Sequence, residues 1–163
     1  MDTLAAQVGA ALKAHGMMLA TAESCTGGGV AQAVTDIAGS SAWFERGFVT
    51  YTNQSKVEML GVRQSTLDTH GAVSEMTVRE MAAGALAHSQ ADVAVAVSGI
   101  AGPSGGTPEK PVGTVCFAWA MRGAEPQVSR HILAGDRAAV REESVQITLQ
   151  GILNILNQQV ISA

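Results

Sequence analysis

The sequence is poor in the residues that build cross-linked, zinc-bound or membrane-spanning proteins. It has two cysteines, Cys25 and Cys116, and its first residues lack a basic start and an apolar run, so we expect free thiols and no secretory signal. The four histidines share no spacing typical of zinc ligands. No apolar stretch reaches the roughly 18–20 residues of a membrane span, so we expect a cytoplasmic protein with no membrane partner.

Charge is scarce as well, while apolar residues are plentiful. Charged residues make up 15% of the chain and the net charge is -4, which gives no long-range attraction to a polyanion, so we expect no nucleic-acid partner. Hydrophobic residues make up 47%, enough to bury a core and to argue against disorder. A chain of 163 residues suits one such core, and we expect a single domain over residues 1–163.

Apolar periodicity predicts helices that alternate with buried strands. The run DVAVAVS is too uniformly apolar for a strand with one wet face, so it should be central and covered on both sides. The fold class that follows is α/β, a three-layer α/β/α sandwich with a mixed, mostly parallel sheet that includes one hairpin. The expected helices are Leu4 to Gly16, Val30 to about Gly39, Asn53 to Leu60, Ser74 to about His88 and one from Asp136 onward; the expected strands are 17–22, 47–52, 92–98, 112–120 and 128–133.

Three polar stretches follow predicted strands: SCTGGG, YTNQSK and SGIAGPSGG. Ligands of open α/β sheets collect at such strand ends, so these stretches are the candidates for a site. Neither a Walker-type GKS/T nor a GxGxxG pattern is present, which disfavours nucleoside-triphosphate and dinucleotide folds. Taken alone, the glycines are explained equally well by the backbone geometry of tight turns.

Ser24 is the first candidate nucleophile. A strand-to-helix turn can expose a hydroxyl beside free backbone N–H groups that would hold a developing oxyanion. The competing interpretation is an N-cap for the following helix, a common use of serine. Cys25 is a rival nucleophile, and no histidine has a carboxylate partner at a suggestive spacing.

Lys56 is the candidate base, because a serine–lysine pair is a known variant of the catalytic triad. It lies in the first turn of the helix expected after Asn53, where the helix dipole disfavours a cation. Dipole repulsion and desolvation would lower its pKa toward the value of about 7–8 that suits a general base. The alternative is a solvated lysine paired with Glu58 or Glu45.

Tyr51 is the only tyrosine, five residues before Lys56. Its hydroxyl would relay a proton or orient the lysine; the alternative is a core aromatic with its hydroxyl at the rim.

Four ordered stretches closely resemble the CinA C-terminal domain family: TAESCTGGGVAQAVTDIAGSSAWFERGFVTYTNQSK, GAVSE, AVSGIAGPSGGTPEKPVGTV and GDRAAVR. The resemblance covers nearly the whole chain. It implies hydrolysis of the carboxamide of nicotinamide mononucleotide to nicotinate mononucleotide and ammonia, with no metal and no other cofactor. It also implies that the family's serine nucleophile falls on Ser24 and its tyrosine and lysine on Tyr51 and Lys56. Two-domain members carry an additional N-terminal domain that is absent from this sequence.

The remaining substrate contacts are expected in two loops and one helix. Backbone N–H groups from Thr26 through Gly27 to Gly28 are candidates for the oxyanion hole, and Arg141 for a phosphate contact, although a solvated helix face explains it and Arg137 nearly as well. A proline-stiffened crossover is the alternative for the glycine loop, whose candidate binding residues are Gly102, Gly105, Gly106 and Thr107.

Two functions of other classes remain open at this point. One is a non-catalytic nucleotide-binding module, and the other is an interaction protein linked to competence and DNA damage. Trp43, Phe44 and Phe48 are interpreted as an aromatic cluster, either core or subunit contact, and we expect a homodimer.

Overall fold

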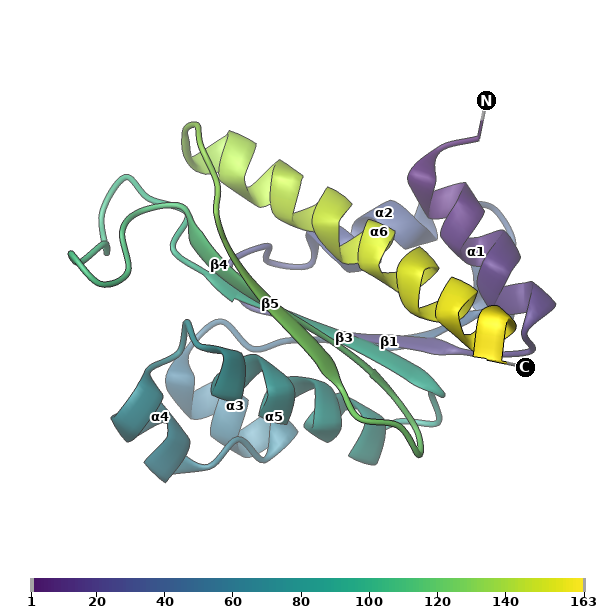
Figure 1. The fold of residues 1–163 in the computed structure, drawn as a ribbon, viewed down its shortest axis with the longest axis horizontal. Coiled ribbons are helices and arrows are strands. Elements are labelled where there is room, and N and C mark those ends of the chain that lie inside the picture. The colour runs from purple at the N-terminus through teal and green to yellow at the C-terminus, as the bar shows by residue number, and fades with distance from the viewer. Residues whose placement is uncertain (1, 163) are drawn as a thin grey trace.

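A five-stranded sheet with helices on both faces forms the protein (Figure 1). The computed structural model describes residues 2–162, and side chains as far as Gln158. The helices are α1 (Leu4–Ala14), α2 (Gly29–Thr35), α3 (Asn53–Leu60), α4 (Gln64–His70), α5 (Glu75–Ala87) and α6 (Arg137–Ser162), with a 3-10 turn at Ser40–Ala42. The strands are β1 (Leu19–Glu23), β2 (Phe44–Val49), β3 (Val93–Gly99), β4 (Thr114–Met121) and β5 (Gln127–Ile132).

The strand order is β2-β1-β3-β4-β5, and β1 is parallel to both β2 and β3. The β4 strand runs antiparallel to β3 and to β5, so four of the five strands share one direction, as the predicted mixed sheet requires. In the β1–β3 register Glu23 pairs with Val97. The carboxyl ends of these two central strands therefore meet at one edge of the sheet, where parallel α/β sheets place their sites.

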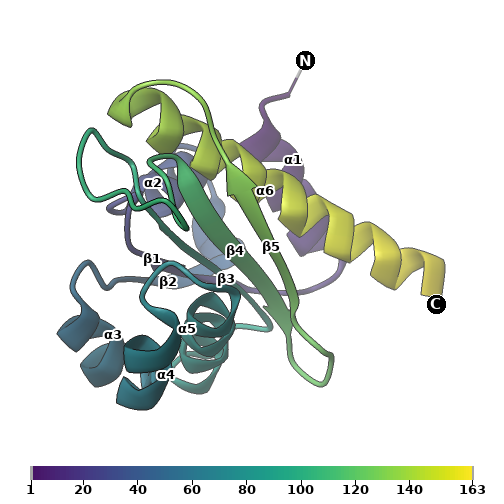
Figure 2. The same ribbon diagram turned by 60° about the vertical axis from the view of Figure 1, so that its left-hand side comes forward.

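The helices form two outer layers that the sheet separates. Figures 1 and 2 show α1, α2 and α6 on one face and α3, α4 and α5 on the other. Each face has its own apolar core, one built around Leu12, Phe117 and Ile152 and the other around Leu60 and Met81. The expected three-layer α/β/α sandwich is confirmed.

The three aromatic residues near β2 do not form one cluster. A register shift between Leu19 and Ala20 on β1 marks a bulge in the pairing with β2. Trp43 and Phe44 consequently pack into the core on the α1 side, while Phe48 packs into the core on the α5 side. Trp43 is only 4% exposed, which makes it a core residue of this chain.

Gly84 lets α5 approach α3 closely. A Cβ at this position would lie 1.9 Å from the Leu60 carbonyl oxygen, and both neighbouring atoms belong to backbone. No larger residue fits without displacing α3, since backbone atoms cannot rotate out of the way. The position of α3 over the sheet therefore depends on a glycine at position 84 of α5.

Some element boundaries differ from those expected. The α4 helix was not predicted, because its sequence QSTLDTH has almost no apolar residues to set a helical period. Helix α2 ends at Thr35 rather than near Gly39, and β2 spans 44–49 rather than 47–52. In the described part of the chain, no helix has the length and apolar character needed to cross a membrane.

Candidate active site

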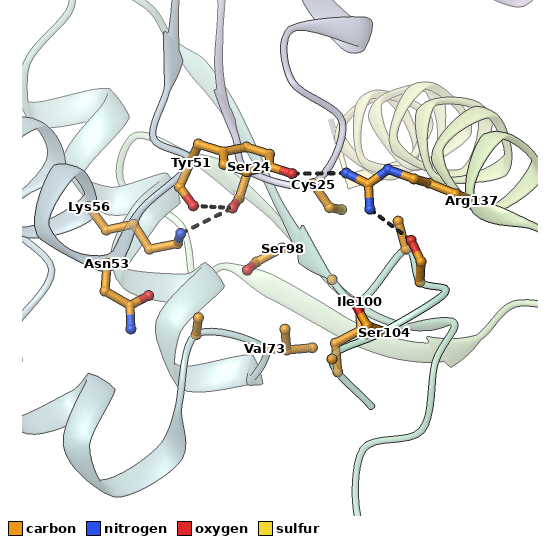
Figure 3. A pocket seen from close by; sticks show the side chains of 15 residues that line it. Ser24, Cys25, Tyr51, Asn53, Lys56, Val73, Ser98, Ile100, Ser104 and Arg137 are labelled. Carbon is orange, nitrogen blue, oxygen red and sulfur yellow. Dashed lines mark hydrogen bonds between the residues drawn. The ribbon is translucent and has the colours of Figure 1, made fainter. Parts of the chain in front are cut away.

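A cavity of about 270 Å³ opens at the carboxyl ends of β1 and β3 (Figure 3). Its walls come from five separate segments: the end of β1, the start of α3, the turn before α5, the end of β3 with the glycine loop that follows it, and the first residue of α6. The lining residues are Ser24, Cys25, Tyr51, Asn53, Lys56, Ala72, Val73, Ser98, Gly99, Ile100, Ala101, Gly102, Ser104, Gly105 and Arg137.

Ser24 and Lys56 meet inside this cavity. The Lys56 Nζ atom donates a hydrogen bond to Ser24 Oγ at 3.1 Å and another to the Thr50 carbonyl at 2.9 Å. Ser24 Oγ in turn donates to the Tyr51 carbonyl at 3.4 Å. Lys56 is 1% exposed and Ser24 is 8% exposed, so the amine and the hydroxyl share a nearly dry environment.

Helix α3 aims the lysine at the serine. The helix begins after Thr52, whose hydroxyl accepts from the Ser55 amide and makes a reciprocal capping box with the Ser55 side chain. Thr52, not the predicted Asn53, is therefore the N-cap, because its hydroxyl is in reach of the third helical N–H group. Side chains in a helix lean toward its N-terminus, so the side chain of Lys56 leans back toward Thr50 and the strand ends.

The amine of Lys56 has no acidic partner among the described residues. Its two hydrogen-bond acceptors are neutral oxygens. Glu58 accepts from Gln54 and Glu45 from Arg46, so the expected alternative of a solvated ion pair is wrong. Burial lowers the pKa of Lys56 to about 8, because a charged ammonium is costly to desolvate.

Glu23 is a buried carboxylate that the sequence interpretation overlooked. Its Oε1 accepts from the Thr26 hydroxyl at 2.5 Å and the Val30 amide at 2.9 Å, while Oε2 accepts from the Ala31 amide at 3.0 Å. Helix α2 has Gly28 as its N-cap and lacks a side-chain cap there, so Glu23 satisfies the orphan N–H groups instead. The available signal was an acid at the end of the short, mostly apolar strand LATAE.

The predicted N-cap role of Ser24 is consequently wrong, and its hydroxyl faces Lys56. Two side chains hold the turn that follows Ser24, Glu23 through the Thr26 hydroxyl and Arg141 through backbone carbonyls. Arg141, on α6, donates from Nε to the Cys25 carbonyl at 3.0 Å and from Nη2 to the Thr26 carbonyl at 3.3 Å. The guanidinium predicted to hold phosphate thus braces the loop, and Arg141 lines a neighbouring cavity of about 660 Å³ rather than the one at Ser24.

The loop amides predicted for the oxyanion hole differ in availability. The Gly27 amide donates to the Ser24 carbonyl at 3.0 Å. Within residues 2–162, the amides of Thr26 and Gly28 donate to no acceptor. Gly27 and Gly28 have φ values of 59° and 101°, a left-handed conformation that favours glycine. Of the three predicted amides, those of Thr26 and Gly28 are therefore free to bind an oxyanion.

Tyr51 lies at the cavity mouth, 57% exposed, so it is not the core aromatic considered as an alternative. Its hydroxyl accepts from Arg137 Nη2 at 3.0 Å rather than contacting Lys56. Arg137 Nη1 also donates to the Gly102 carbonyl at 2.8 Å, so this guanidinium joins the tyrosine to the glycine loop (Figure 3). It is the backbone carbonyl of Tyr51, not its hydroxyl, that contacts Ser24.

The glycine loop contributes only part of its predicted set. Gly102 and Gly105 line the cavity, but Gly106 and Thr107 do not. A Cβ on Gly106 would lie 2.7 Å from the Val112 amide nitrogen, so that glycine allows a close backbone approach. Thr107 exchanges backbone and side-chain hydrogen bonds with Lys110 and closes the loop.

Cys25 lines the cavity but is a poor nucleophile. Its side chain is 6% exposed, and burial raises the pKa of its thiol to about 11, so it stays protonated near neutral pH. Three of the histidines, His15, His88 and His131, contact acceptors elsewhere in the fold. Among the described residues, no three His, Cys, Asp or Glu side chains are grouped as metal ligands would be. The polar side chains of the cavity carry an amine, hydroxyls, a carboxamide and a guanidinium.

Known proteins resemble this chain over most of its length. The CinA C-terminal domain family model matches residues 1–156. The nicotinamide-nucleotide amidohydrolase PncC of Escherichia coli K12 is 60% identical over 147 residues, covering 90% of this chain and 89% of that protein. PncC of Pseudomonas putida is 50% identical, covering 95% and 96%.

Among solved structures, the competence/damage inducible protein CihA from Agrobacterium tumefaciens superimposes with a TM-score of 0.91 at 48% identity, over 94% of this chain and 93% of that one. The match to the family model covers nearly all of the folded core. The chain belongs to the CinA C-terminal domain family.

Proposed function

We propose that this protein hydrolyses the carboxamide of nicotinamide mononucleotide to nicotinate mononucleotide and ammonia, with Ser24 as nucleophile and Lys56 as base. The observation that carries the proposal is the buried amine 3.1 Å from the serine hydroxyl, at the wall of a cavity. A pKa of about 8 leaves roughly a tenth of the lysine neutral at pH 7, enough to act as a base. Relatives at 50% and 60% identity carry the name of a nicotinamide-nucleotide amidohydrolase, which supports this substrate.

In the first half-reaction, neutral Lys56 takes the proton from Ser24 Oγ, which forms a bond to the carboxamide carbon. The carbonyl electron pair moves onto oxygen, and the free amides of Thr26 and Gly28 stabilise that oxyanion. When the oxyanion collapses, the C–N bond breaks and the Lys56 ammonium passes its proton to the departing nitrogen. Ammonia leaves, and the acyl group remains on Ser24 as an ester.

In the second half-reaction, a water molecule enters where ammonia left. Lys56, neutral again, takes a proton from this water as its oxygen attacks the ester carbon. Collapse of the second tetrahedral intermediate returns the proton to Ser24 Oγ and releases the carboxylic acid. The exposed Tyr51 hydroxyl takes no part in these transfers, because its contact is with Arg137.

The nucleotide phosphate is held by Arg137 in this scheme. Arg137 lines the cavity and lies in the first turn of α6, where the helix dipole favours an anion. The Arg141 guanidinium keeps the loop carbonyls of Cys25 and Thr26 in place instead. Replacing Arg137 by glutamine would therefore raise the Michaelis constant for the mononucleotide more than it lowers kcat.

The deciding experiment measures ammonia release from nicotinamide mononucleotide by purified wild-type protein and by Ser24→Ala. The wild type should release stoichiometric ammonia and nicotinate mononucleotide, and the variant should lose at least about a thousandfold in kcat/KM. Calorimetry measures the affinity of both proteins for the mononucleotide, so that binding can be compared with turnover. Tight binding by the wild type without turnover would favour the non-catalytic nucleotide-binding module, while full activity of Ser24→Ala would refute the serine mechanism.

A further inference from the structure

A second hydroxyl faces the same cavity and is not used in the mechanism above. Ser98 ends the apolar run of β3, is 1% exposed and lines the cavity beside Ser24 and Lys56. Figure 3 shows its oxygen turned into the cavity on the side of Lys56. Its hydroxyl has no hydrogen-bond partner in the described part of the chain. Because this hydroxyl borders the cavity and is not bonded to the protein, it is available to bond a substrate group there.

The sheet register places Ser98 beside the nucleophile. Glu23 pairs with Val97, and the Ser24 amide donates to the Val97 carbonyl at 3.0 Å, so the parallel ladder continues to this edge. Extending the register by one residue sets Ser24 opposite Ser98 on neighbouring strands, which are about 4.8 Å apart. A planar carboxamide group is of the size that spans two hydroxyls at that spacing.

Both hydroxyls also project from the same face of the sheet. Side chains alternate along a strand, and the residues two positions earlier, Ala22 and Ala96, both belong to the core under α5. Lys56 reaches the cavity from α3, which lies on this face. The free loop amides of Thr26 and Gly28 follow Ser24 in the chain, where the turn leads to α2 on the opposite face.

We propose that Ser98 Oγ accepts a hydrogen bond from the scissile NH2 group of the substrate and holds the carboxamide in one orientation over Ser24. The carbonyl oxygen then points to the loop amides, and the nitrogen points to the face that carries Ser98 and Lys56. This orientation delivers the leaving nitrogen to the amine that must protonate it. The inference rests on the proposed amidase function and assigns a substrate contact within it.

The test compares two substrates that differ in the group that Ser98 contacts. One is nicotinamide mononucleotide, and the other is the methyl ester of nicotinate mononucleotide, whose leaving group has no N–H. In Ser98→Ala, kcat/KM for the amide should fall about tenfold, the loss of one hydrogen bond, while kcat/KM for the ester should change less than about twofold. Because kcat/KM covers the steps up to acylation, deacylation does not affect the comparison. Ser98→Thr, which keeps a hydroxyl, should recover most of the amide activity.

Ser144→Ala is the matched control, since Ser144 is a fully buried serine of α6 whose hydroxyl bonds the Val140 carbonyl outside the cavity. It should leave both substrates unaffected. An equal loss on amide and ester in Ser98→Ala, or no loss on either, would overturn the proposed contact. The Ser24→Ala variant separates the two proposals: if it retains wild-type activity, the serine mechanism itself fails, whatever Ser98 does.

Discussion

The two sides of the β1 carboxyl end each bury an ionisable group, and they treat it in opposite ways. On the α2 side, Glu23 is fully buried and accepts three hydrogen bonds from the loop and the helix that follow. On the α3 side, Lys56 is equally buried but touches only a hydroxyl and a carbonyl. The donors around Glu23 tie its carboxylate to the turn and to α2, whereas burial lowers the pKa of Lys56 to about 8 and leaves its amine without an acidic partner among the described residues. Under the proposed mechanism, the α2 side holds the turn in place and the α3 side transfers the proton.

Removing the amine should have the largest effect. Lys56→Met keeps much of the side-chain volume and should lower kcat/KM for nicotinamide mononucleotide by about a thousandfold, because among the described residues Lys56 is the only side chain with a hydrogen bond to Ser24 Oγ. Steady-state ammonia release measures the loss, and circular dichroism checks the fold. Lys13→Met, on exposed α1 surface, is the control and should retain full activity. Substantial activity in Lys56→Met would mean that the proton goes elsewhere.

The pH dependence of kcat/KM should show the titration of Lys56 in the wild-type protein. With a Lys56 pKa of about 8, the neutral fraction rises roughly fiftyfold between pH 6 and pH 8, and kcat/KM should rise with it and then level off. A rate profile over pH 5.5–10 gives the inflection. A flat profile across pH 7–9 would contradict a lysine base.

Stability should respond to pH in the same direction. The folded protein binds the Lys56 proton with a pKa of about 8, and the unfolded chain binds it with the ordinary value of 10.5, so the unfolded state holds more protons between these values. The free energy of unfolding therefore rises with pH through that window, by up to about 3 kcal/mol, and the penalty is complete below pH 8. Urea unfolding at pH 7.5 and 10.5 should show this rise in the wild type and in Lys13→Met but not in Lys56→Met.

A substitution of Glu23, on the α2 side, should reduce activity less than Lys56→Met does. Its effect on the free energy of unfolding should also depend less on pH. Glu23→Gln keeps the shape but replaces one acceptor oxygen with a donor facing an N–H group, which should cost about 1–3 kcal/mol and roughly tenfold in kcat as the turn loses its position. Glu80→Gln is the matched control, because Glu80 likewise holds the Arg63 amide and the Thr66 hydroxyl, at the start of α4, away from the cavity. It should lose stability and keep kcat; a Glu23→Gln enzyme with unchanged kcat would show that the turn needs no such support.

The smallest effect is expected at Cys25. Cys25→Ala should change kcat/KM by less than about threefold, because the reacting oxygen and amine stay in place and a thiol with a pKa of about 11 contributes no thiolate. Labelling with iodoacetamide at pH 7.5 should likewise be slow. A loss as large as that of Ser24→Ala would transfer the nucleophile to the thiol.

The layers of the fold were predictable, because buried strands and amphipathic helices leave clear periods in the sequence. Helix α4 was not, since QSTLDTH offers no apolar period, and the bulge that separates Phe44 from Phe48 depends on pairing with β1. Ser24 and Lys56 were singled out by chemical type and local position, and the structure places them in contact.

Glu23 and Ser98 were missed for a different reason. Each is a polar residue at or next to the end of a mostly apolar strand, but only the β1–β3 register shows that both lie at the same edge. The sequence favoured Arg141 over Arg137 as a phosphate contact, but one helical turn separates them and only tertiary contacts decide that Arg137 lines the cavity.

Gly84 does not line the cavity, but it helps to set the position of the helix that carries Lys56. Its hydrogen atom lets the Leu60 carbonyl rest against α5, and Leu60 is one helical turn from Lys56 on the same short helix. Even a methyl group there would push α3 outward and carry the amine with it. We therefore expect activity to depend on a residue of a neighbouring helix that does not line the cavity, and a set of variants confined to the cavity lining would not include it.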